Sequence, residues 1–431
     1  MKNSYDVIIV GGGTAGVSCA WNCGTLGLKT LLVEKNTFLG GSITSSLVIP
    51  AMKTSNNSIN NDFFNILYKK LTEINGAITY IDGNKGWFNP HLTKIALDML
   101  MLDANVDVIF GTTLSCIKTD ETKILSVCIE TIDNDNSIVK NEGELSLPIE
   151  TRFIVDATGD AKICQKLNCE FLNILENKKE TVQPKSLRFI MSGIDIEIFS
   201  KWLLEYDTDR DVTTSCSVNG DTYLSTAYTW DSAKWALKPI FEQAIKDGVL
   251  KESDSNYFQL FSVAGTFDSI AFNAPRLLDT SLSTSNAYIE GRLAILRISE
   301  FCKKYLPGFE KAHISSIADS IGIRVSNRVK GKYIYTYNDL ITGKIFDNPV
   351  LVSNYPVDIH SDKKDASKLE KVMQEYQLPL EALVVDKYKN LFVIGRCISA
   401  EFEAQAALRI IPSCFSMGEG LAKYLNKNMF S

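Results

Sequence analysis

The chain has 431 residues, 45% of them hydrophobic and 22% charged, which is ordinary for a soluble globular protein. That length exceeds one simple hydrophobic core and predicts two or three subdomains. The 45 basic and 51 acidic residues give a net charge of −6 spread along the chain, so nothing indicates a nucleic-acid surface. No apolar run approaches the length of a bilayer span, and the first expected strand leaves no room for a signal peptide. We therefore expect a cytoplasmic protein.

The ten cysteines are scattered, without C-x-x-C or another spacing typical of zinc or iron–sulfur ligands, so no metal site is expected. In a reducing compartment we expect free thiols. Cys19 and Cys23, four residues apart on the first expected helix, share a face and are interpreted as small buried residues.

A glycine loop near the N-terminus predicts dinucleotide binding. The apolar run 7–10 is typical of a buried parallel strand, and Gly11, Gly13 and Gly16 then form G-x-G-x-x-G at the start of a helix. The first N–H groups of such a helix face a diphosphate. A second strand, 30–33, ends in Glu34, where a carboxylate can accept hydrogen bonds from an adenosine ribose. The alternative, a glycine turn that only packs a helix on a sheet, leaves Glu34 unexplained.

The remaining elements are expected from periodicity, caps and breakers. Two helices have a predicted apolar stripe: Leu92, Ile95, Ala96, Met99 and Leu100 in the helix that starts at Asn89-Pro90, and Ile289, Leu293, Leu296 and Ile298 in helix 285–305. We expect further helices at 62–74, 197–206, 232–247 and 416–425, a ligand-hugging loop at 42–58, strands at 106–110, 186–191 and 222–229, a hairpin arm at 114–132 with its turn at 133–143, a β-rich piece at 257–272, and basic residues among β-formers at 320–337.

Two later stretches resemble parts of the same nucleotide-binding sheet. FIVDATGD, at 153–160, is a strand that ends in small residues, where backbone can approach a ligand. NLFVIGRCIS, at 390–399, is another strand that runs into a glycine, Gly395. A nucleotide-sheet pattern at both ends of the chain favours FAD over a nicotinamide cofactor, and no second G-x-G-x-x-G indicates a separate NAD(P)H domain.

With these stretches the chain resembles the bacterial FAD-dependent oxidoreductase family of the glutathione-reductase-like flavoprotein class, related to fumarate reductase flavoproteins and heterodisulfide reductase flavin subunits. The resemblance covers nearly the whole chain. It rests on the stretches VGGGTAG (10–16), EKNTFLGG (34–41), VDATGD (155–160), IGIRVSNRVKGKY (321–333), YPVDIH (355–360), YQLPLEALV (376–384) and GRCISAEFEAQAALRIIPSC (395–414).

The resemblance implies an α/β fold, in which a Rossmann-like FAD-binding domain with a three-layer parallel sheet carries an inserted α+β substrate domain. The implied boundaries are 1–164 and 386–431 for the FAD-binding domain and 165–385 for the insertion. The FAD contacts that the resemblance implies are Gly11, Gly13, Thr14, Ala15 and Gly16 at the pyrophosphate, Glu34 and Lys35 at the adenosine ribose, Gly40, Gly41 and Ser42 at the ribityl side, Thr158, Gly159 and Asp160 closing over the cofactor, and Gly395, Arg396, Pro412, Ser413 and Cys414 beside the flavin. The helix expected from Ser416 would point its positive end at the flavin pyrimidine edge.

Two positions depart from the family pattern. The family usually has an acidic residue after the first arginine of I-R-x-S-x-R, where this chain has Val325. It also commonly has a histidine just before the glutamate of the C-terminal motif, where this chain has Phe402. Both departures weaken the transfer of family catalytic roles.

The catalytic candidates follow from what a flavin leaves to the protein: holding substrate and managing a proton. His360 is the first candidate for the proton, against a structural role. Arg324, Arg328 and Arg409 are candidates for holding a carboxylate or stabilising reduced flavin, and Glu403 is a candidate partner of one of them. Cys397 and Cys414 flank the expected flavin, as packing residues or as a covalent link or redox thiol.

The sequence thus predicts an FAD-dependent oxidoreductase that transfers a hydride between flavin N5 and a small organic substrate. Two alternatives stay open. One is an aromatic-hydroxylase type of monooxygenase that uses NAD(P)H and oxygen, and the other is a catalytically silent flavin-binding subunit. The expected partners are a small-molecule substrate and either an electron-transfer partner or NAD(P)H, whereas nucleic acid and membrane partners are not expected. Substrate identity and oligomeric state are not readable from the sequence.

Overall fold

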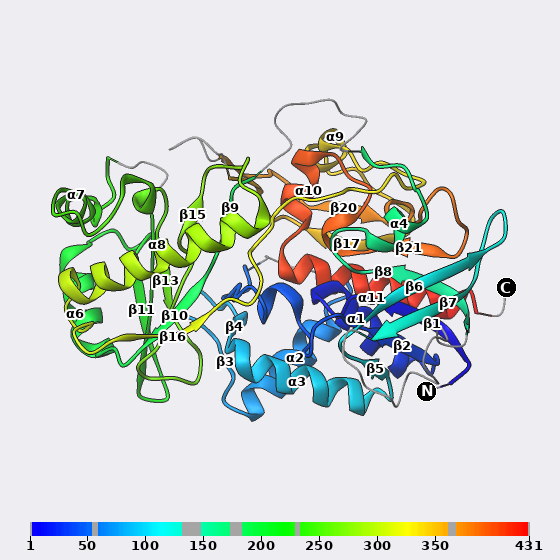
Figure 1. The fold of residues 1–431 in the computed structure, drawn as a ribbon, viewed down its shortest axis with the longest axis horizontal. Helices are drawn as coiled ribbons and strands as arrows, with labels where there is room; N and C mark the ends of the chain where they lie inside the picture. Colours follow the sequence, from blue (N-terminus) through cyan, green and yellow to red (C-terminus); the bar gives the residue numbers. More distant parts are fainter. Residues whose placement is uncertain are drawn as a thin grey trace.

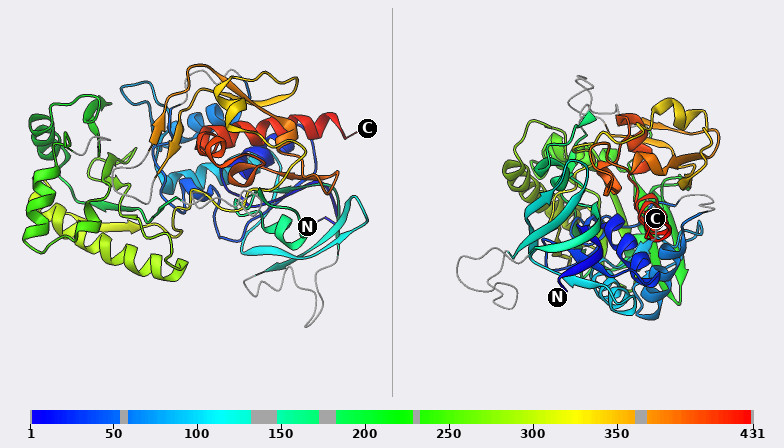
Figure 2. Two further views of the ribbon diagram at one scale, coloured as in Figure 1. Left: turned by 90° about the horizontal axis from the view of Figure 1, so that it is seen from above. Right: turned by 90° about the vertical axis from the view of Figure 1, so that its right-hand side faces the viewer.

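The computed structural model describes residues 2–53, 59–131, 148–172, 183–228, 233–360 and 368–429. Two larger sheets lie at opposite ends of the molecule, with both chain termini on the side of the first sheet (Figure 1). Seen from above, the second sheet and its helices again form a separate lobe (Figure 2). This mixed α/β architecture confirms the predicted fold class, while the exact domain boundaries stay a prediction.

The first sheet joins both ends of the chain. Its parallel core is β5 (Asp107–Ile109), β2 (Thr30–Val33), β1 (Ser4–Val10) and β8 (Ile149–Asp156), and β21 (Leu391–Val393) pairs parallel with β8. Val7 to Val10 and all of β2 are buried, as expected for strands covered on both faces. The predicted return of the C-terminal stretch to the nucleotide sheet is therefore confirmed.

A hairpin extends this sheet and contains a tight turn that the sequence analysis did not predict. β6 (Thr112–Thr119) pairs antiparallel with β7 (Ile124–Thr131), and β7 pairs antiparallel with β8. The expected single arm 114–132 is thus two strands, because Asp120 accepts hydrogen bonds from the backbone of Thr122 and Lys123 and closes a tight turn. The turn predicted at 133–143 lies outside the described residues.

The same hairpin corrects the cysteine prediction. Cys116 and Cys128 are directly opposite on β6 and β7 and form a disulfide. The eight other cysteines are free thiols, as expected. The spacing of Cys116 and Cys128 in the sequence did not predict this disulfide, because the pairing depends on the register of the hairpin.

Two helices pack closely on the first sheet. α1 (Thr14–Thr25) contacts α11 (Ile411–Lys427), where Ser18 Oγ donates to the carbonyl of Phe415 at 2.7 Å. A Cβ at Gly418 would lie 2.4 Å from the carbonyl oxygen of Ala15, so only glycine allows this approach. The helix predicted from Ser416 actually begins at Ile411, because Pro412 occupies its first turn, a favourable place for proline.

The helices α2 (Asp62–Glu73) and α3 (Pro90–Asp103) lie below this sheet in Figure 1 and confirm the expected elements. Asn89 caps α3, since its side chain accepts from the backbone of His91 and Leu92. The predicted stripe of α3 is partly wrong, because Ile95 and Met99 are exposed whereas Ala96 and Leu100 are buried.

The second sheet is antiparallel in the order β11-β12-β13-β14-β10-β16. Its long helix α8 (Thr284–Tyr305) buries Ala287, Gly291, Ile295, Ile298 and Phe301. Of the predicted stripe only Ile298 is therefore buried, while Ile289, Leu293 and Leu296 are exposed. The strands are β10 (Phe189–Ser192), β11 (Thr214–Val218), β12 (Asp221–Ala227), β13 (Gln259–Ser262), β14 (Ile270–Phe272) and β16 (His313–Ile317), with helices α6 (Ile196–Tyr206) and α7 (Lys238–Lys246) beside them.

The helix expected at 232–247 is shorter in the structure, because α7 begins at Lys238 with Pro239 in its first turn. The segment 320–337 forms extended backbone with isolated bridges to four other segments rather than a strand. The remaining short elements are β3 (Ala77–Ile78), β4 (Trp87–Phe88), α4 (Lys162–Lys166), β9 (Lys185–Ser186), β15 (Arg276–Leu277), α9 (Tyr337–Ile341), β17 (Pro349–Ser353), β18 (Val357–Ile359), β19 (Lys368–Glu370), β20 (Tyr376–Pro379) and α10 (Phe402–Leu408), with 3-10 turns at Gly41–Ile43, Glu252–Ser255, Leu380–Ala382 and Gly395–Cys397.

Candidate functional site

The glycine loop has the shape that a diphosphate needs. A Cβ at Gly11 would lie 2.5 Å from the carbonyl oxygen of Ala157, and one at Gly16 would lie 1.9 Å from that of Gly11. Gly13 differs, because a Cβ there would meet nothing within 4 Å, so the backbone borders open space. Gly13 is also the N-cap of α1 and supplies no side-chain cap to its first N–H groups. Open space at uncapped amides fits the pyrophosphate of a dinucleotide.

Glu34 lies where the sequence places the ribose acceptor. Its Oε2 accepts from the Gly12 N–H at 2.6 Å, and its Oε1 accepts from the backbone and side-chain nitrogens of Asn36, both at 2.8 Å. Burial raises the pKa of Glu34, although these hydrogen bonds and the charge of Lys35 oppose the shift. The carboxylate is thus held at the end of β2, directly beside the glycine loop.

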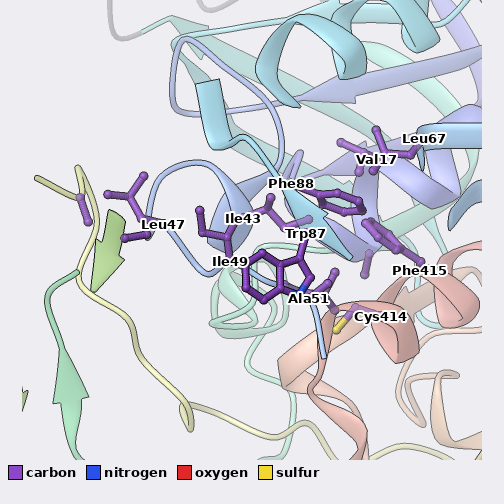
Figure 3. Close-up of a cluster of buried hydrophobic side chains, with 14 of the residues drawn as sticks. Val17, Ile43, Leu47, Ile49, Ala51, Leu67, Trp87, Phe88, Cys414 and Phe415 are labelled. Carbon is purple, nitrogen blue, oxygen red and sulfur yellow. The ribbon is translucent and has the colours of Figure 1, made fainter. Parts of the chain in front are cut away.

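The loop after Gly40 rests on an apolar cluster. Gly40 donates its N–H to the carbonyl of Gly12 at 2.8 Å, which fixes this loop beside the glycine turn. Ile43, Leu47 and Ile49 are buried and lie near Trp87, with Phe415 of α11 in the same cluster (Figure 3). The middle of the predicted loop, 43–51, is therefore largely buried, while Ser42, Met52 and Lys53 are exposed and 54–58 lie outside the described residues.

Asp156, which the sequence analysis did not single out, anchors the turn at residues 157–160, called the ATGD turn below. Its Oδ1 accepts from the backbone and hydroxyl of Thr158, and its Oδ2 accepts from the backbone of Ile163 and Cys164 at 2.8 and 3.1 Å. Burial raises its pKa even though these four donors act in the opposite direction. Asp156 therefore fixes the turn whose residues were predicted to close over the cofactor.

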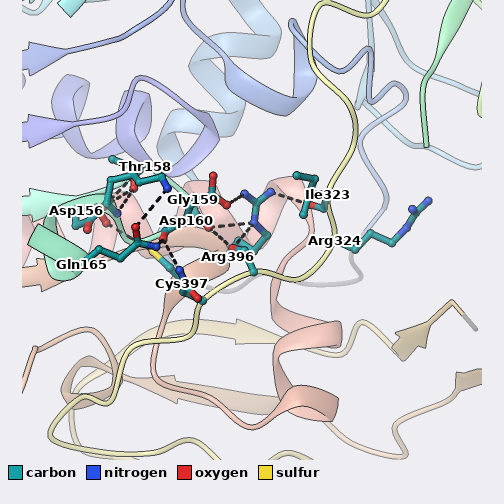
Figure 4. Close-up of polar contacts among 12 residues, drawn as sticks. Asp156, Thr158, Gly159, Asp160, Gln165, Ile323, Arg324, Arg396 and Cys397 are labelled. Atoms are coloured by element: carbon teal, nitrogen blue, oxygen red, sulfur yellow. Dashed lines mark hydrogen bonds and ion pairs between the residues drawn. The ribbon is translucent and has the colours of Figure 1, made fainter. Parts of the chain in front are cut away.

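Arg396 joins three stretches that are far apart in sequence. Its Nε donates to the carbonyl of Gly159 at 3.0 Å and its Nη2 lies 2.7 Å from Oδ1 of Asp160. Its Nη1 donates to the carbonyl of Ile323 at 2.7 Å, and Ser326 completes the contacts (Figure 4). The ATGD turn, the segment 320–328 and the 3-10 turn after β21 are thereby brought together.

The residues expected beside the flavin start α11. Pro412, Ser413 and Cys414 lie in its first turn, and α11 has no side-chain cap. Ser413 Oγ and Gln405 Oε1 are buried and have no hydrogen-bond partner in the described part of the chain. Such orphaned polar atoms fit a bound group with its own donors and acceptors. Burial raises the pKa of Cys414 to about 11 and that of Cys397 further, so both thiols are protonated at neutral pH.

Three of the predicted catalytic residues meet in one buried cluster. Arg324 lies in the segment 320–328 and extends away from Arg396 (Figure 4). Arg409 follows α10, and His360 follows β18, which packs beside α10. Arg328 is elsewhere, since its Nη1 donates to the carbonyl of Ala400 at 2.7 Å. Glu403 acts on Tyr337, whose pKa it helps to raise, and the ionic partner of Arg409 is Asp358 instead.

Asp358 is the carboxylate of this cluster. Its Oδ2 lies 3.2 Å from Nη2 of Arg409 and 3.4 Å from Nε2 of His360. Burial alone would raise the pKa of Asp358, but the hydrogen bond from His360 and the charges of Arg409 and Arg324 hold it below its ordinary value. Burial, followed by the charge of Arg324, lowers the pKa of His360 well below its ordinary value. The cluster therefore holds an ionised Asp358 and a neutral His360.

Sequence reasoning missed two further arginines of the cluster. Arg276 on β15 pairs across to Ser186, whose hydroxyl accepts from Nη1 of Arg324 at 3.1 Å. Arg188, just before β10, donates its Nε to the side chain of Asn273 at 2.9 Å. The charges of Arg276, Arg409 and Arg188 all act on Arg324 and help to lower its pKa, after burial. No spacing in the sequence links these four arginines, because long-range contacts between separate elements, such as the pairing of β15 with β9, bring them together.

A family model described as "FAD dependent oxidoreductase" matches residues 6–424. The chain belongs to this family. This oxidoreductase is therefore an enzyme whose cofactor is FAD, and the glycine cradle, the uncapped start of α1 and the orphaned atoms near α11 fit that group.

Local matches to curated proteins are short. The oxidoreductase is 43% identical over 44 residues to the mitochondrial glycerol-3-phosphate dehydrogenase of Rattus norvegicus and 39% identical over 54 residues to a Dictyostelium discoideum protein named as a bifunctional amine oxidase. These matches span 10% and 12% of this chain and only 6% and 5% of those relatives.

Solved flavoproteins resemble the chain over nearly its full length at low identity. A geranylgeranyl bacteriochlorophyll reductase-like protein of Thermoplasma acidophilum covers 98% of this chain and 78% of its own, with 12% identity and a TM-score of 0.47. The p-nitrophenol 4-monooxygenase of Pseudomonas putida covers 99% of this chain and 81% of its own, with 9% identity and a TM-score of 0.44.

No helix within the described ranges is long and apolar enough to cross a membrane.

Proposed function

We propose that this oxidoreductase transfers a hydride between FAD and a small organic substrate held by the arginine cluster. The observation that carries the proposal is the double role of segment 320–328. Through Ile323 and Ser326 it is tied to Arg396 in the predicted flavin wall, and through Arg324 it reaches the buried cluster of His360 and Asp358. One short segment thus connects the cofactor side with the residues able to hold substrate and a proton.

FAD, when bound, supplies a hydride acceptor or donor at N5. His360 supplies the matching proton site. Because ionised Asp358 only accepts, the neutral imidazole carries its hydrogen on Nε2, and Nδ1 remains a bare acceptor. Nδ1 is buried and has no partner among the described residues, so it is available to a substrate hydroxyl or amine proton. With FAD bound, the flavin would supply the hydride chemistry, and Nδ1 of His360 would accept the substrate proton in oxidation and return it in reduction.

The test is anaerobic reduction of the FAD-loaded protein, followed by the visible absorption of the flavin. We expect an organic substrate alone to bleach the flavin band without NAD(P)H or oxygen, and His360→Asn to slow this step. A flavin that is reduced only by NAD(P)H and that needs oxygen for product would instead favour the monooxygenase. Failure of every donor and acceptor would indicate a silent flavin-binding subunit.

Acid precipitation gives the mode of attachment in the same preparation. Yellow colour in the supernatant would show non-covalent FAD, and colour kept in the pellet would make Cys397, Cys414 or His360 the anchor. A cytoplasmic location and the domain boundaries 1–164, 165–385 and 386–431 belong to the same proposal.

A further inference from the structure

We propose that the arginine cluster binds a small organic dicarboxylate, with Arg276 as the side-on anchor of one carboxylate. The cluster is defined here as Arg188, Arg276, Arg324 and Arg409 together with Asp358 and His360. This inference rests on the proposed function, because it names the substrate class of the same site.

The cluster carries more positive charge than its own residues neutralise. Among the described residues, four guanidinium groups act on one another electrostatically, and Asp358 is the carboxylate that acts on Arg276, Arg324 and Arg409. His360 is neutral and adds no charge. Burying unpaired charges is unfavourable, so such an excess in a folded protein indicates an anionic ligand. One monoanion would leave most of the excess uncompensated, whereas a dianion removes the larger part.

Arg276 shows the geometry of the expected contact. It is only 5% exposed, yet both Nε and Nη2 have no hydrogen-bond partner among the described residues. These two N–H groups point in the same direction and form the fork that holds the two oxygens of one carboxylate. The guanidinium carbon lies 3.5 Å from the ring centre of Tyr257, which fixes its plane. Arg276 is therefore a preformed carboxylate clamp.

Other elements supply donors for a second anionic group. Arg188 Nη1 and Arg409 Nε are buried and lack partners in the described part of the chain, and so does Nε2 of Gln183. Gln183 is positioned by its Oε1, which accepts from the His360 backbone at 3.1 Å. Because these donors come from separate elements and not from one backbone loop, the site suits two carboxylates on a short carbon chain more than one compact phosphate.

Calorimetric titration of the FAD-loaded protein tests the inference with four named probes: succinate, glutarate, butyrate and inorganic phosphate. We expect at least one dicarboxylate to bind about tenfold or more tightly than butyrate and phosphate, which corresponds to about 1.4 kcal/mol. Arg276→Gln should weaken dicarboxylate binding by about tenfold or more. Arg276→Lys should also weaken it, since lysine has no fork.

Arg292→Gln is the matched control, because Arg292 is an exposed arginine on α8 outside the cluster, and it should leave binding unchanged. Arg188→Gln provides a second cluster variant from another element if Arg276→Gln does not fold, as judged by circular dichroism. Equal binding of phosphate or butyrate, no binding of any probe, or cluster variants that bind like the wild type would overturn the inference. Dicarboxylate binding without flavin reduction by any donor would refute only the proposed function.

Discussion

Nη2 of Arg409 lies 3.2 Å from Oδ2 of Asp358, which joins the end of α10 to β18. Asp358→Asn removes the carboxylate from among the buried arginines, so we expect the free energy of unfolding to fall by about 3–5 kcal/mol in the absence of ligand. Urea unfolding followed by circular dichroism measures the change.

Asp103→Asn is the control for this variant. Asp103 is 62% exposed and pairs with Lys70 on the surface, so its loss should cost less than about 1 kcal/mol. Similar effects of the two substitutions would contradict the assignment of Asp358 as the counter-charge of the cluster.

The glycine loop allows cofactor binding to be separated from packing. Gly13→Ala should leave the stability of the cofactor-free protein within about 0.5 kcal/mol, because the new methyl group meets nothing within 4 Å. The same methyl group would occupy the diphosphate space and weaken FAD binding by about tenfold or more, or about 1.4 kcal/mol. Gly16→Ala should instead destabilise the fold by about 1–3 kcal/mol, since its Cβ would lie 1.9 Å from the carbonyl oxygen of Gly11. The flavin absorbance per protein measures FAD binding, and thermal unfolding measures stability, in both variants. A normal FAD content in Gly13→Ala would mean that the glycine loop only packs the helix on the sheet.

The parallel strands of the first sheet were predictable because each rests on a local pattern. At both β1 and β8 the sequence shows a buried strand that leads into a glycine-containing turn. The two strands pair in parallel in the structure. The helix faces were less predictable. The stripe Ile289, Leu293 and Leu296 has helical spacing but is exposed. A second set of positions at helical spacing, Ala287, Gly291, Ile295, Ile298 and Phe301, forms the buried face of α8 instead.

The arginine cluster was only half predictable. Arg324 and His360 belong to stretches that the family resemblance marks, and Arg409 lies in a third. Arg276 and Arg188 come from the inserted region, where the pairing of β9 with β15 places Arg276 opposite Ser186 and hence near Arg324. Such long-range pairing leaves no periodic trace in the sequence.

Replacing Arg396 should lower both the free energy of unfolding and the FAD content. Arg396→Lys keeps the charge but cannot reproduce the contacts to Gly159, Asp160 and Ile323, and we expect a loss of about 2 kcal/mol or more in unfolding free energy. FAD content should fall as well, because the ATGD turn loses its tie to the C-terminal wall. Arg297→Lys is the matched control, since Arg297 binds Asp254 through a similar fork on α8 at 2.7 and 2.8 Å. It should lose stability but retain FAD, and equal FAD loss in both variants would refute a specific role for Arg396.

His360 predicts a pH dependence with a definite sign. Its pKa in the folded protein lies well below the ordinary value near 6.5, chiefly through burial and the charge of Arg324, so the unfolded chain binds a proton that the native protein does not. This contribution to stability is present above about pH 6.5 and is lost as the pH falls below it, by up to about 1.4 kcal/mol per pH unit. Urea unfolding of ligand-free wild type and His360→Asn between pH 5 and 7.5 should show the wild type losing more stability toward acid. The window stays above the ordinary titration range of carboxylates such as Asp358, and the difference between the two proteins cancels the contribution of His91, whose pKa burial also lowers. Parallel pH profiles for the two proteins would mean that folding leaves the pKa of His360 unchanged, which would contradict its burial beside the charge of Arg324.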